Sequence, residues 1–139
     1  MVTLDTSTVL SLEVPKDKYF HWPLLDDVKI TVTASSTCPE IITDSLVSPA
    51  QDVVINGNKF TRKEGSGVGA GNLYREFIYD TISNGTCYHI DLFSHGTNGA
   101  GFYVNEPDLI AKYDTQHKVD MDAMLSIFTG MVNSFRIVL

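Results

Sequence analysis

The chain has few basic residues: ten lysines and arginines stand against seventeen aspartates and glutamates, giving a formal charge of −7 over 139 residues. A face that binds nucleic acid needs clustered lysine and arginine, so we do not expect that class of function. No apolar run approaches the roughly 20 residues of a membrane-spanning helix. The first twenty residues, MVTLDTSTVLSLEVPKDKYF, contain neither a basic start nor a continuous apolar stretch, so we expect no signal peptide there.

Cysteine is also scarce, with Cys38 and Cys87 alone in the sequence. An even count fits one disulfide, although two cysteines also occur in reduced proteins. Few basic residues, abundant Thr, Ser, Asn and Gly, and many short strand patterns are typical of exported proteins, in which disulfides persist. We therefore predict a Cys38–Cys87 bridge and an extracytoplasmic location, whether secreted, periplasmic or anchored at the cell surface. A lipid anchor upstream of this sequence is an open possibility.

The composition, 43% hydrophobic and 19% charged, is that of a globular protein. We expect a single domain over residues 1–139, with residues 1–14 as a frayed N-terminal segment that contains candidate strand residues. A chain of this length buries a sizeable core without needing a metal ion.

Three segments have strand patterns. Residues Val28–Thr33 alternate between apolar and polar side chains, which predicts a half-buried strand. Two hairpins are predicted, over 52–63 and 74–95, because the pairs Asn56-Gly57 and Asn84-Gly85 suit type I′ turns. A two-residue turn at Asn84-Gly85 sets the register of the second hairpin, with these facing pairs: Ser83 and Thr86, Asp80 and His89, Ile78 and Asp91, Tyr74 and His95.

This register divides the second hairpin into two faces. One is apolar and is expected to face the core: Phe77, Tyr79, Tyr88, Ile90 and Leu92. The other is mixed, and we expect it to be either partly solvated or covered by a further layer: Tyr74, Glu76, Ile78, Asp80, Cys87, His89, Asp91, Phe93 and His95.

The remaining segments are predicted as loops and helices. The glycine-rich stretch Gly65–Asn72 is expected to be a surface loop, because it has no lysine and precedes a strand pattern rather than a helix. Pro107 suits the start of a helix of about two turns. A second, amphipathic helix is predicted to begin at an Asp120 cap and to end near Phe135, where a last strand, FRIVL, follows. We predict an α+β fold, with this C-terminal helix packed on one face of a twisted antiparallel sheet.

Residues 53–139 resemble the PsbP-like group. The resemblance is carried by an Asn-Gly hairpin, the glycine-rich stretch, a long aromatic strand with its partner, and a helix that runs into Ser134-Phe135-Arg136-Ile137. The chain is also similar to small exported or lipoprotein domains of bacteria. The resemblance implies an α/β/α sandwich, a location outside the cytoplasm and a binding or assembly role, and it implies no catalytic residue.

The mixed face contains the candidate chemical groups: Glu76, Asp80, His89 and Asp91. His95 is about 20 Å from His89 along an extended strand, so the two imidazoles do not share an ion. Asp80, His89 and Asp91 form the compact set that suits a divalent ion, and a cross-strand acid–imidazole pair explains them equally well. Glu76 with Asp91 is a candidate carboxylate pair for glycoside hydrolysis, and an unoxidised Cys87 beside His89 is a candidate thiol–imidazole pair.

We assign no catalytic residue, metal or cofactor from these patterns. The expected function is a non-enzymatic exported domain that binds a protein, a peptide or a small ligand, or that assembles with a partner. The alternative is a small metal-dependent hydrolase that uses the Asp80 and His89 face.

Overall fold

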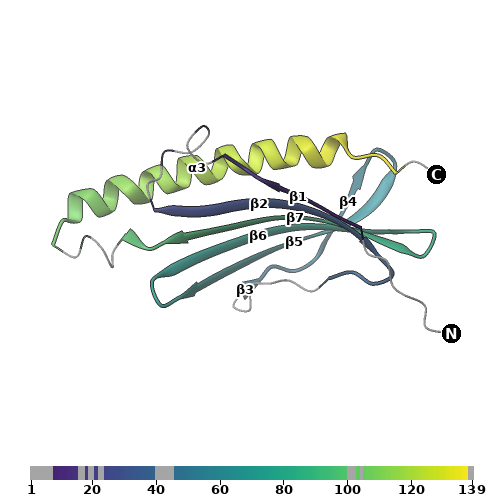
Figure 1. The fold of residues 1–139 in the computed structure, drawn as a ribbon, viewed down its shortest axis with the longest axis horizontal. Helices are drawn as coiled ribbons and strands as arrows, with labels where there is room; N and C mark the ends of the chain where they lie inside the picture. Colours follow the sequence, from purple (N-terminus) through teal and green to yellow (C-terminus); the bar gives the residue numbers. More distant parts are fainter. Residues whose placement is uncertain are drawn as a thin grey trace.

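A computed structural model of the chain describes residues 8–15, 18, 21, 24–39, 46–99, 103 and 105–137. These residues form a seven-stranded antiparallel sheet and a long helix (Figure 1). The elements are β1 (Thr8–Glu13), β2 (Leu25–Ser35), β3 (Leu46–Val47), β4 (Gln51–Ile55), β5 (Asn58–Gly69), β6 (Asn72–Ser83), β7 (Thr86–Thr97) and α3 (Pro107–Ser134). Within the frayed segment expected over 1–14, Thr8–Glu13 pair with β2, and residues 1–7 lie outside the described part.

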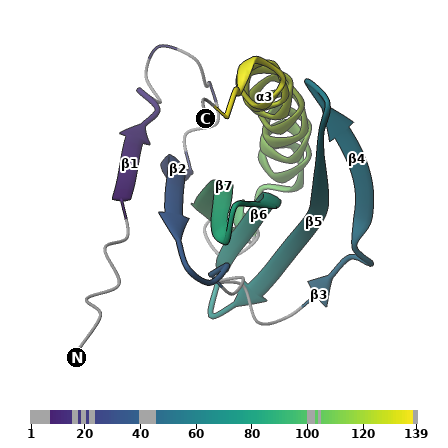
Figure 2. The same ribbon diagram turned by 90° about the vertical axis from the view of Figure 1, so that its right-hand side faces the viewer.

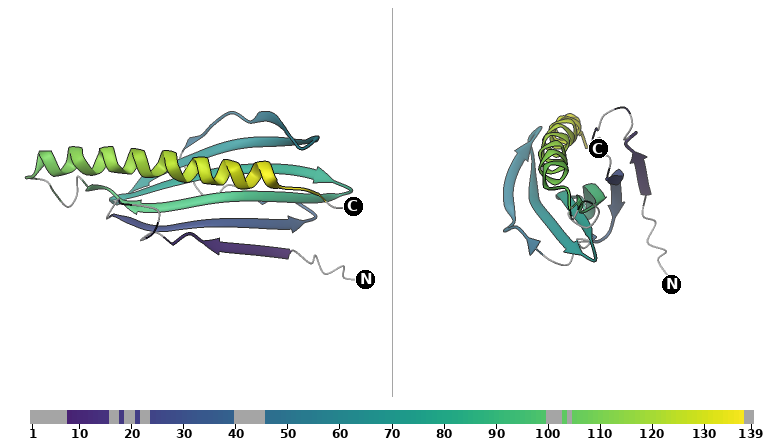
Figure 3. Two further views of the ribbon diagram at one scale, coloured as in Figure 1. Left: turned by 90° about the horizontal axis from the view of Figure 1, so that it is seen from above. Right: turned by 90° about the vertical axis from the view of Figure 1, so that its left-hand side faces the viewer.

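The sheet has the strand order β1-β2-β7-β6-β5-β3, and β4 also pairs with β5. Viewed along the strands, it curves around α3, which lies on its concave face (Figure 2). From above, α3 runs along the strands over the middle of the sheet (Figure 3). The predicted α+β fold with a C-terminal helix on one face is therefore confirmed. An α/β/α sandwich needs helices on both faces, and this finer expectation stays unconfirmed.

Both predicted hairpins are present. Asn56 and Gly57 have φ values of 52° and 81°, and Asn84 and Gly85 have values of 50° and 75°. Such left-handed conformations are those that type I′ turns require. The second turn sets the register predicted from sequence, including Asp80 opposite His89 and Tyr74 opposite His95.

The glycine-rich stretch is not the surface loop that was expected. Gly65–Gly69 belong to β5, and only Ala70 and Gly71 form the turn, with φ values of 49° and 82°. Each glycine keeps its backbone donor and acceptor, so a strand pairs through it even though it has no side chain to pack. Gly65 and Gly67 lie opposite Glu76 and Tyr74 of β6, and the aromatic strand thus extends the pairing to the turn.

The two predicted helices are one continuous helix of 28 residues, with Pro107 in its first turn. Asp120 was predicted to cap the start of a helix, but it lies buried in the middle of α3. Its carboxylate accepts hydrogen bonds from Gln116 Nε2 at 2.8 Å and from the backbone N–H of His21 at 2.7 Å, so it has partners without ending the helix. The predicted last strand is also wrong for 135–137, which have no regular structure, and 138–139 lie outside the described residues. No helix in the described part is both long and apolar enough to cross a bilayer.

The core lies between α3 and the concave face of the sheet. The apolar face predicted for the second hairpin contributes to it, because Phe77, Tyr79, Ile90 and Leu92 are buried there. Phe128 of α3 is fully buried and contacts the edge of Tyr79, with ring centroids 5.8 Å apart. This packing fixes the position of α3 over β6 and β7, and therefore the shape of the space beneath its N-terminal half.

Candidate functional site

The four predicted polar residues of the mixed face lie together on the face of the sheet opposite α3. We call them the acid–imidazole cluster: Glu76, Asp80, His89 and Asp91. Glu76 is 0% exposed and the others are between 4% and 8% exposed, so these four side chains are buried rather than solvated. His89 Nδ1 lies 2.6 Å from Asp80 Oδ1, which makes the cross-strand pair predicted from the turn register. Lys63 Nζ lies 3.8 Å from the other oxygen of Asp80.

Asp91 is the most perturbed acid of this cluster. Burial, followed by the negative charge of Glu76, raises the pKa of the Asp91 carboxyl to about 7, with the charge on His89 opposing this. Glu76 and Asp91 also share a hydrogen bond. Two carboxyl groups in such contact repel each other when both are ionised, so the Asp91 carboxyl keeps its proton until close to neutral pH. The Oδ1 atom of Asp91 is buried and has no hydrogen-bond partner among the described residues.

The cluster is suited to holding protons rather than to contacting a substrate. His89 and Asp91 are buried, and the Nδ1 atom of His89 is engaged by Asp80. A general acid or base needs hydrogen-bond reach to the group that it serves. The sequence placed these residues on one face of the hairpin, and the structure shows that they are buried there.

Cys38 and Cys87 form the predicted disulfide, which joins the segment after β2 to the start of β7. Asp80 lies close to it, because one oxygen of Asp80 and the two sulfurs are within 4.8 Å of one another. Sulfurs joined in a disulfide are not thiolates, and only a thiolate is a strong metal ligand or nucleophile. The candidate Cys87–His89 thiol–imidazole pair requires an unoxidised Cys87, so the disulfide excludes it. A cavity of about 370 Å³ borders the disulfide, lined in part by Asp80, Lys59 and Lys63.

A second cavity, of about 310 Å³, lies between α3 and β6. We call it the helix–sheet cleft. Its lining combines three apolar side chains with five charged or titratable ones: Phe77, Met121 and Leu125, then Arg75, Asp114, His117, Lys118 and Asp122. It forms because α3 extends along the sheet past its tightly packed centre at Phe128, toward the β5–β6 turn (Figure 1).

Arg75 is the central polar residue of the helix–sheet cleft. Its guanidinium is paired with Glu64 and lies 5.4 Å from the centroid of the Phe77 ring. Its Nε–H donor is buried and has no acceptor among the described residues. Burial, and secondarily the charge of Arg75, lowers the pKa of His117 from its usual value. The cleft thus combines a fixed cation, a titratable imidazole and an apolar floor.

This cleft was not predicted from the sequence. Arg75 precedes Phe77 by two residues, so the strand period places it on the core face. A charged side chain on a core face is the signal that was missed, because a long basic side chain can cover apolar surface with its stem while its charged end stays partly exposed, as in Arg75, whose side chain is 40% exposed.

No family model, curated protein or solved structure matches this chain. The PsbP-like resemblance is therefore neither supported nor opposed by these comparisons.

Proposed function

We propose that this chain is a non-enzymatic extracytoplasmic binding domain that holds a small amphipathic anion in the helix–sheet cleft. The ligand class is a carboxylate with a short apolar chain. The observation that carries the proposal is the buried Nε–H donor of Arg75, which has no acceptor among the described residues and belongs to a side chain that lines a cavity with an apolar floor.

The physical chemistry favours this ligand class. A buried donor without an acceptor costs about 1–3 kcal/mol, and a carboxylate that accepts from it recovers this cost through a charge-assisted bond. Phe77, Met121 and Leu125 supply apolar surface for the ligand's hydrocarbon part. A volume of about 310 Å³ suits a small ligand.

We expect His117 to make the affinity of the cleft for an anion depend on pH. Burial lowers its pKa in the free protein. A carboxylate bound beside it would favour the imidazolium and raise that pKa, so binding would take up a proton. Affinity for the anion is therefore expected to rise as the pH falls below neutrality, and His117→Gln is expected to remove this dependence.

The proposed location rests on the disulfide. Cys87 is buried and bonded to Cys38, which suggests an oxidising environment. Secretion, a periplasmic location and lipid anchoring are all compatible with this bond.

The alternative function, a small metal-dependent hydrolase, is favoured by the cavity that Asp80 lines beside the disulfide. It ranks second because His89 is buried and its Nδ1 atom is engaged by Asp80. Under this alternative, His89→Ala would abolish hydrolysis of a chromogenic ester in the folded protein, whereas the binding proposal expects no such activity in the wild type.

The test is a titration of the ¹⁵N-labelled, disulfide-bonded protein with octanoate, with octylammonium and 1-octanol as probes of the charge requirement. We expect octanoate to shift the amide resonances of residues that line the cleft and to bind at least tenfold more tightly than either comparator. Arg75→Gln should remove this preference, whereas Arg62→Gln, on the neighbouring strand β5, should keep it. Equal binding of all three compounds, or an unchanged octanoate affinity in Arg75→Gln, would refute the proposal.

A further inference from the structure

The disulfide between Cys38 and Cys87 lies next to a carboxylate. One oxygen of Asp80 and the two sulfurs are within 4.8 Å of one another. In the part of the chain that the structure describes, no other three side chains of His, Cys, Asp or Glu bring ligand atoms so close together. While the sulfurs are bonded to each other they are not metal ligands, so the question is what reduction of this bond would leave behind.

The strand register explains why these side chains meet. Asp80 of β6 faces His89 of β7, and Cys87 precedes His89 by two residues. Cys87 and Asp80 are therefore diagonal neighbours on one face of the hairpin. The pairing of β2 with β7 ends at Ser35 opposite Cys87, which brings Cys38 to the same corner three residues later.

Neighbouring side chains hold the carboxylate of Asp80 in place. Its Oδ1 atom is 2.6 Å from Nδ1 of His89, and its Oδ2 atom is 3.8 Å from Nζ of Lys63. Carboxylates that bind metal ions are usually oriented in this way by hydrogen bonds from a second layer of residues. Asp80 is only 8% exposed and Cys87 only 1%, so a metal ion here would be largely shielded from water.

We propose that reduction of the Cys38–Cys87 bond creates a zinc site, with the two thiolates and the Asp80 carboxylate as ligands and water in the fourth position. A dithiol reductant would supply two electrons and two protons and become a disulfide, while the protein S–S bond breaks and two thiols form. Zn²⁺ would then displace both thiol protons as the two Zn–S bonds form. The bond and the zinc site exclude each other, since they use the same two sulfurs.

The change in geometry is small. Tetrahedral zinc with Zn–S bonds of about 2.3 Å holds two sulfurs roughly 3.8 Å apart, compared with about 2 Å in a disulfide. Each sulfur would move by about 1 Å, while the backbone keeps the two Cα atoms 5.3 Å apart. The cavity of about 370 Å³ that Cys38 and Asp80 line provides the space for this movement and for the water ligand. Thiolates favour zinc over calcium and magnesium, which prefer oxygen ligands.

The first test measures zinc affinity of the full chain by competition with a chromophoric chelator, before and after reduction with a phosphine. We expect the reduced wild type to bind one zinc ion at least 100-fold more tightly than the oxidised wild type. Asp80→Asn should weaken zinc binding by the reduced protein at least tenfold. Asp52→Asn, which changes another carboxylate that lines the same cavity, should leave it unchanged. Equal affinities in Asp80→Asn and the wild type would overturn the site.

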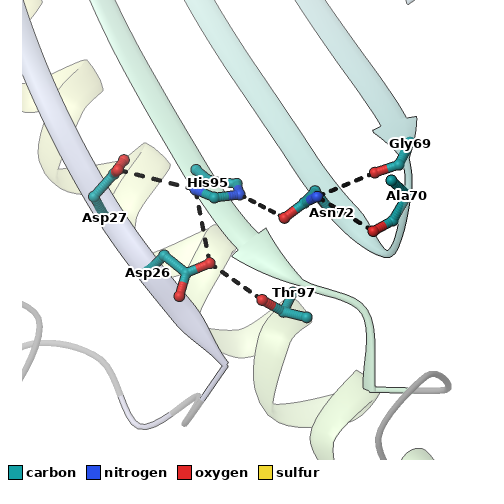
Figure 4. Close-up of polar contacts among 7 residues, drawn as sticks. All are labelled: Asp26, Asp27, Gly69, Ala70, Asn72, His95 and Thr97. Carbon is teal, nitrogen blue, oxygen red and sulfur yellow. Dashed lines mark hydrogen bonds and ion pairs between the residues drawn. The ribbon is translucent and has the colours of Figure 1, made fainter.

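His95 provides a control for zinc binding elsewhere. It lies near the end of β7 that is far from Cys87, where its Nδ1 atom is 3.7 Å from Asp26 Oδ2 and its Nε2 atom is 2.9 Å from Asn72 Oδ1 (Figure 4). His95→Gln should leave the zinc affinity of the reduced protein unchanged. A loss as large as that expected for Asp80→Asn would place the ion at the wrong end of the strand and overturn the proposal.

The second test uses only the wild type and does not depend on how a variant folds. Cobalt(II) replaces zinc as the probe, because thiolate ligands give it a charge-transfer absorption band and tetrahedral coordination gives it intense visible bands. We expect both features when one equivalent of cobalt is added to the reduced protein, and neither in the oxidised protein. The proposal fails if the thiolate band is absent, or if circular dichroism shows the reduced, metal-loaded protein to be unfolded.

Discussion

The contact between Glu76 and Asp91 predicts that the free energy of unfolding depends on pH. The test is the variant Asp91→Asn, which keeps the shape of the side chain and removes its charge. In the folded protein the pKa of Asp91 is raised from its ordinary value of 3.8 to about 7. The folded state therefore holds a proton that the unfolded state has released, so the wild type loses stability as the pH rises between these two values.

The magnitude follows from the size of this shift. One pKa unit corresponds to about 1.4 kcal/mol, and the interval from pH 5 to the folded pKa covers about two units. We therefore expect the wild type to lose about 3 kcal/mol of unfolding free energy from this group between pH 5 and 8. Asp91→Asn lacks the group, so its stability relative to the wild type should increase by about this amount over the same range.

The assay is urea denaturation followed by far-UV circular dichroism at pH 5, 6, 7 and 8, with the disulfide intact. Glu13→Gln is the control, since Glu13 is an exposed carboxylate on β1. Its stability difference from the wild type should stay nearly constant with pH. A difference between Asp91→Asn and the wild type that also stays constant would refute the inferred shared proton.

Three further changes test the packing and the turns. Phe128→Ala should cost about 3–5 kcal/mol in urea denaturation, because Phe128 is fully buried against Tyr79; a cost below 1 kcal/mol would contradict the position of α3. Replacing Cys38 and Cys87 by serine should cost about 4 kcal/mol, because the bond spans 49 residues, and an unchanged midpoint would contradict its structural role. Gly85→Ala, at a φ of 75°, should cost about 1–2 kcal/mol, whereas Gly69→Ala should cost less because its φ is not positive and the space around it is open. Equal thermal midpoints for these two glycine variants would contradict the type I′ turn.

Local sequence signals predicted the two hairpins and the register of the second one correctly. Asn84-Gly85 sets the register of β6 against β7, and that register alone pairs Asp80 with His89. The signals failed where partners lay far away in sequence. Asp120 was predicted to be a helix cap from its local pattern alone. Its actual partner is the backbone N–H of His21, 99 residues away, and a local pattern cannot show this contact.

The helix–sheet cleft shows the same limit. The helix–sheet cleft depends on where α3 lies over Arg75, which the packing of Phe128 decides. The position of a helix over a sheet does not follow from the spacing of residues along the chain, so Arg75 and His117 had no predicted relation.

The most direct measurement of the binding proposal is the side-chain Nε–H resonance of Arg75, observed by ¹H–¹⁵N correlation during a titration with octanoate. We predict that the resonance shifts downfield and saturates at the same concentration as the amide resonances of the cleft. An Arg75 Nε–H resonance that does not move with octanoate, or that moves equally with 1-octanol, would contradict the proposal.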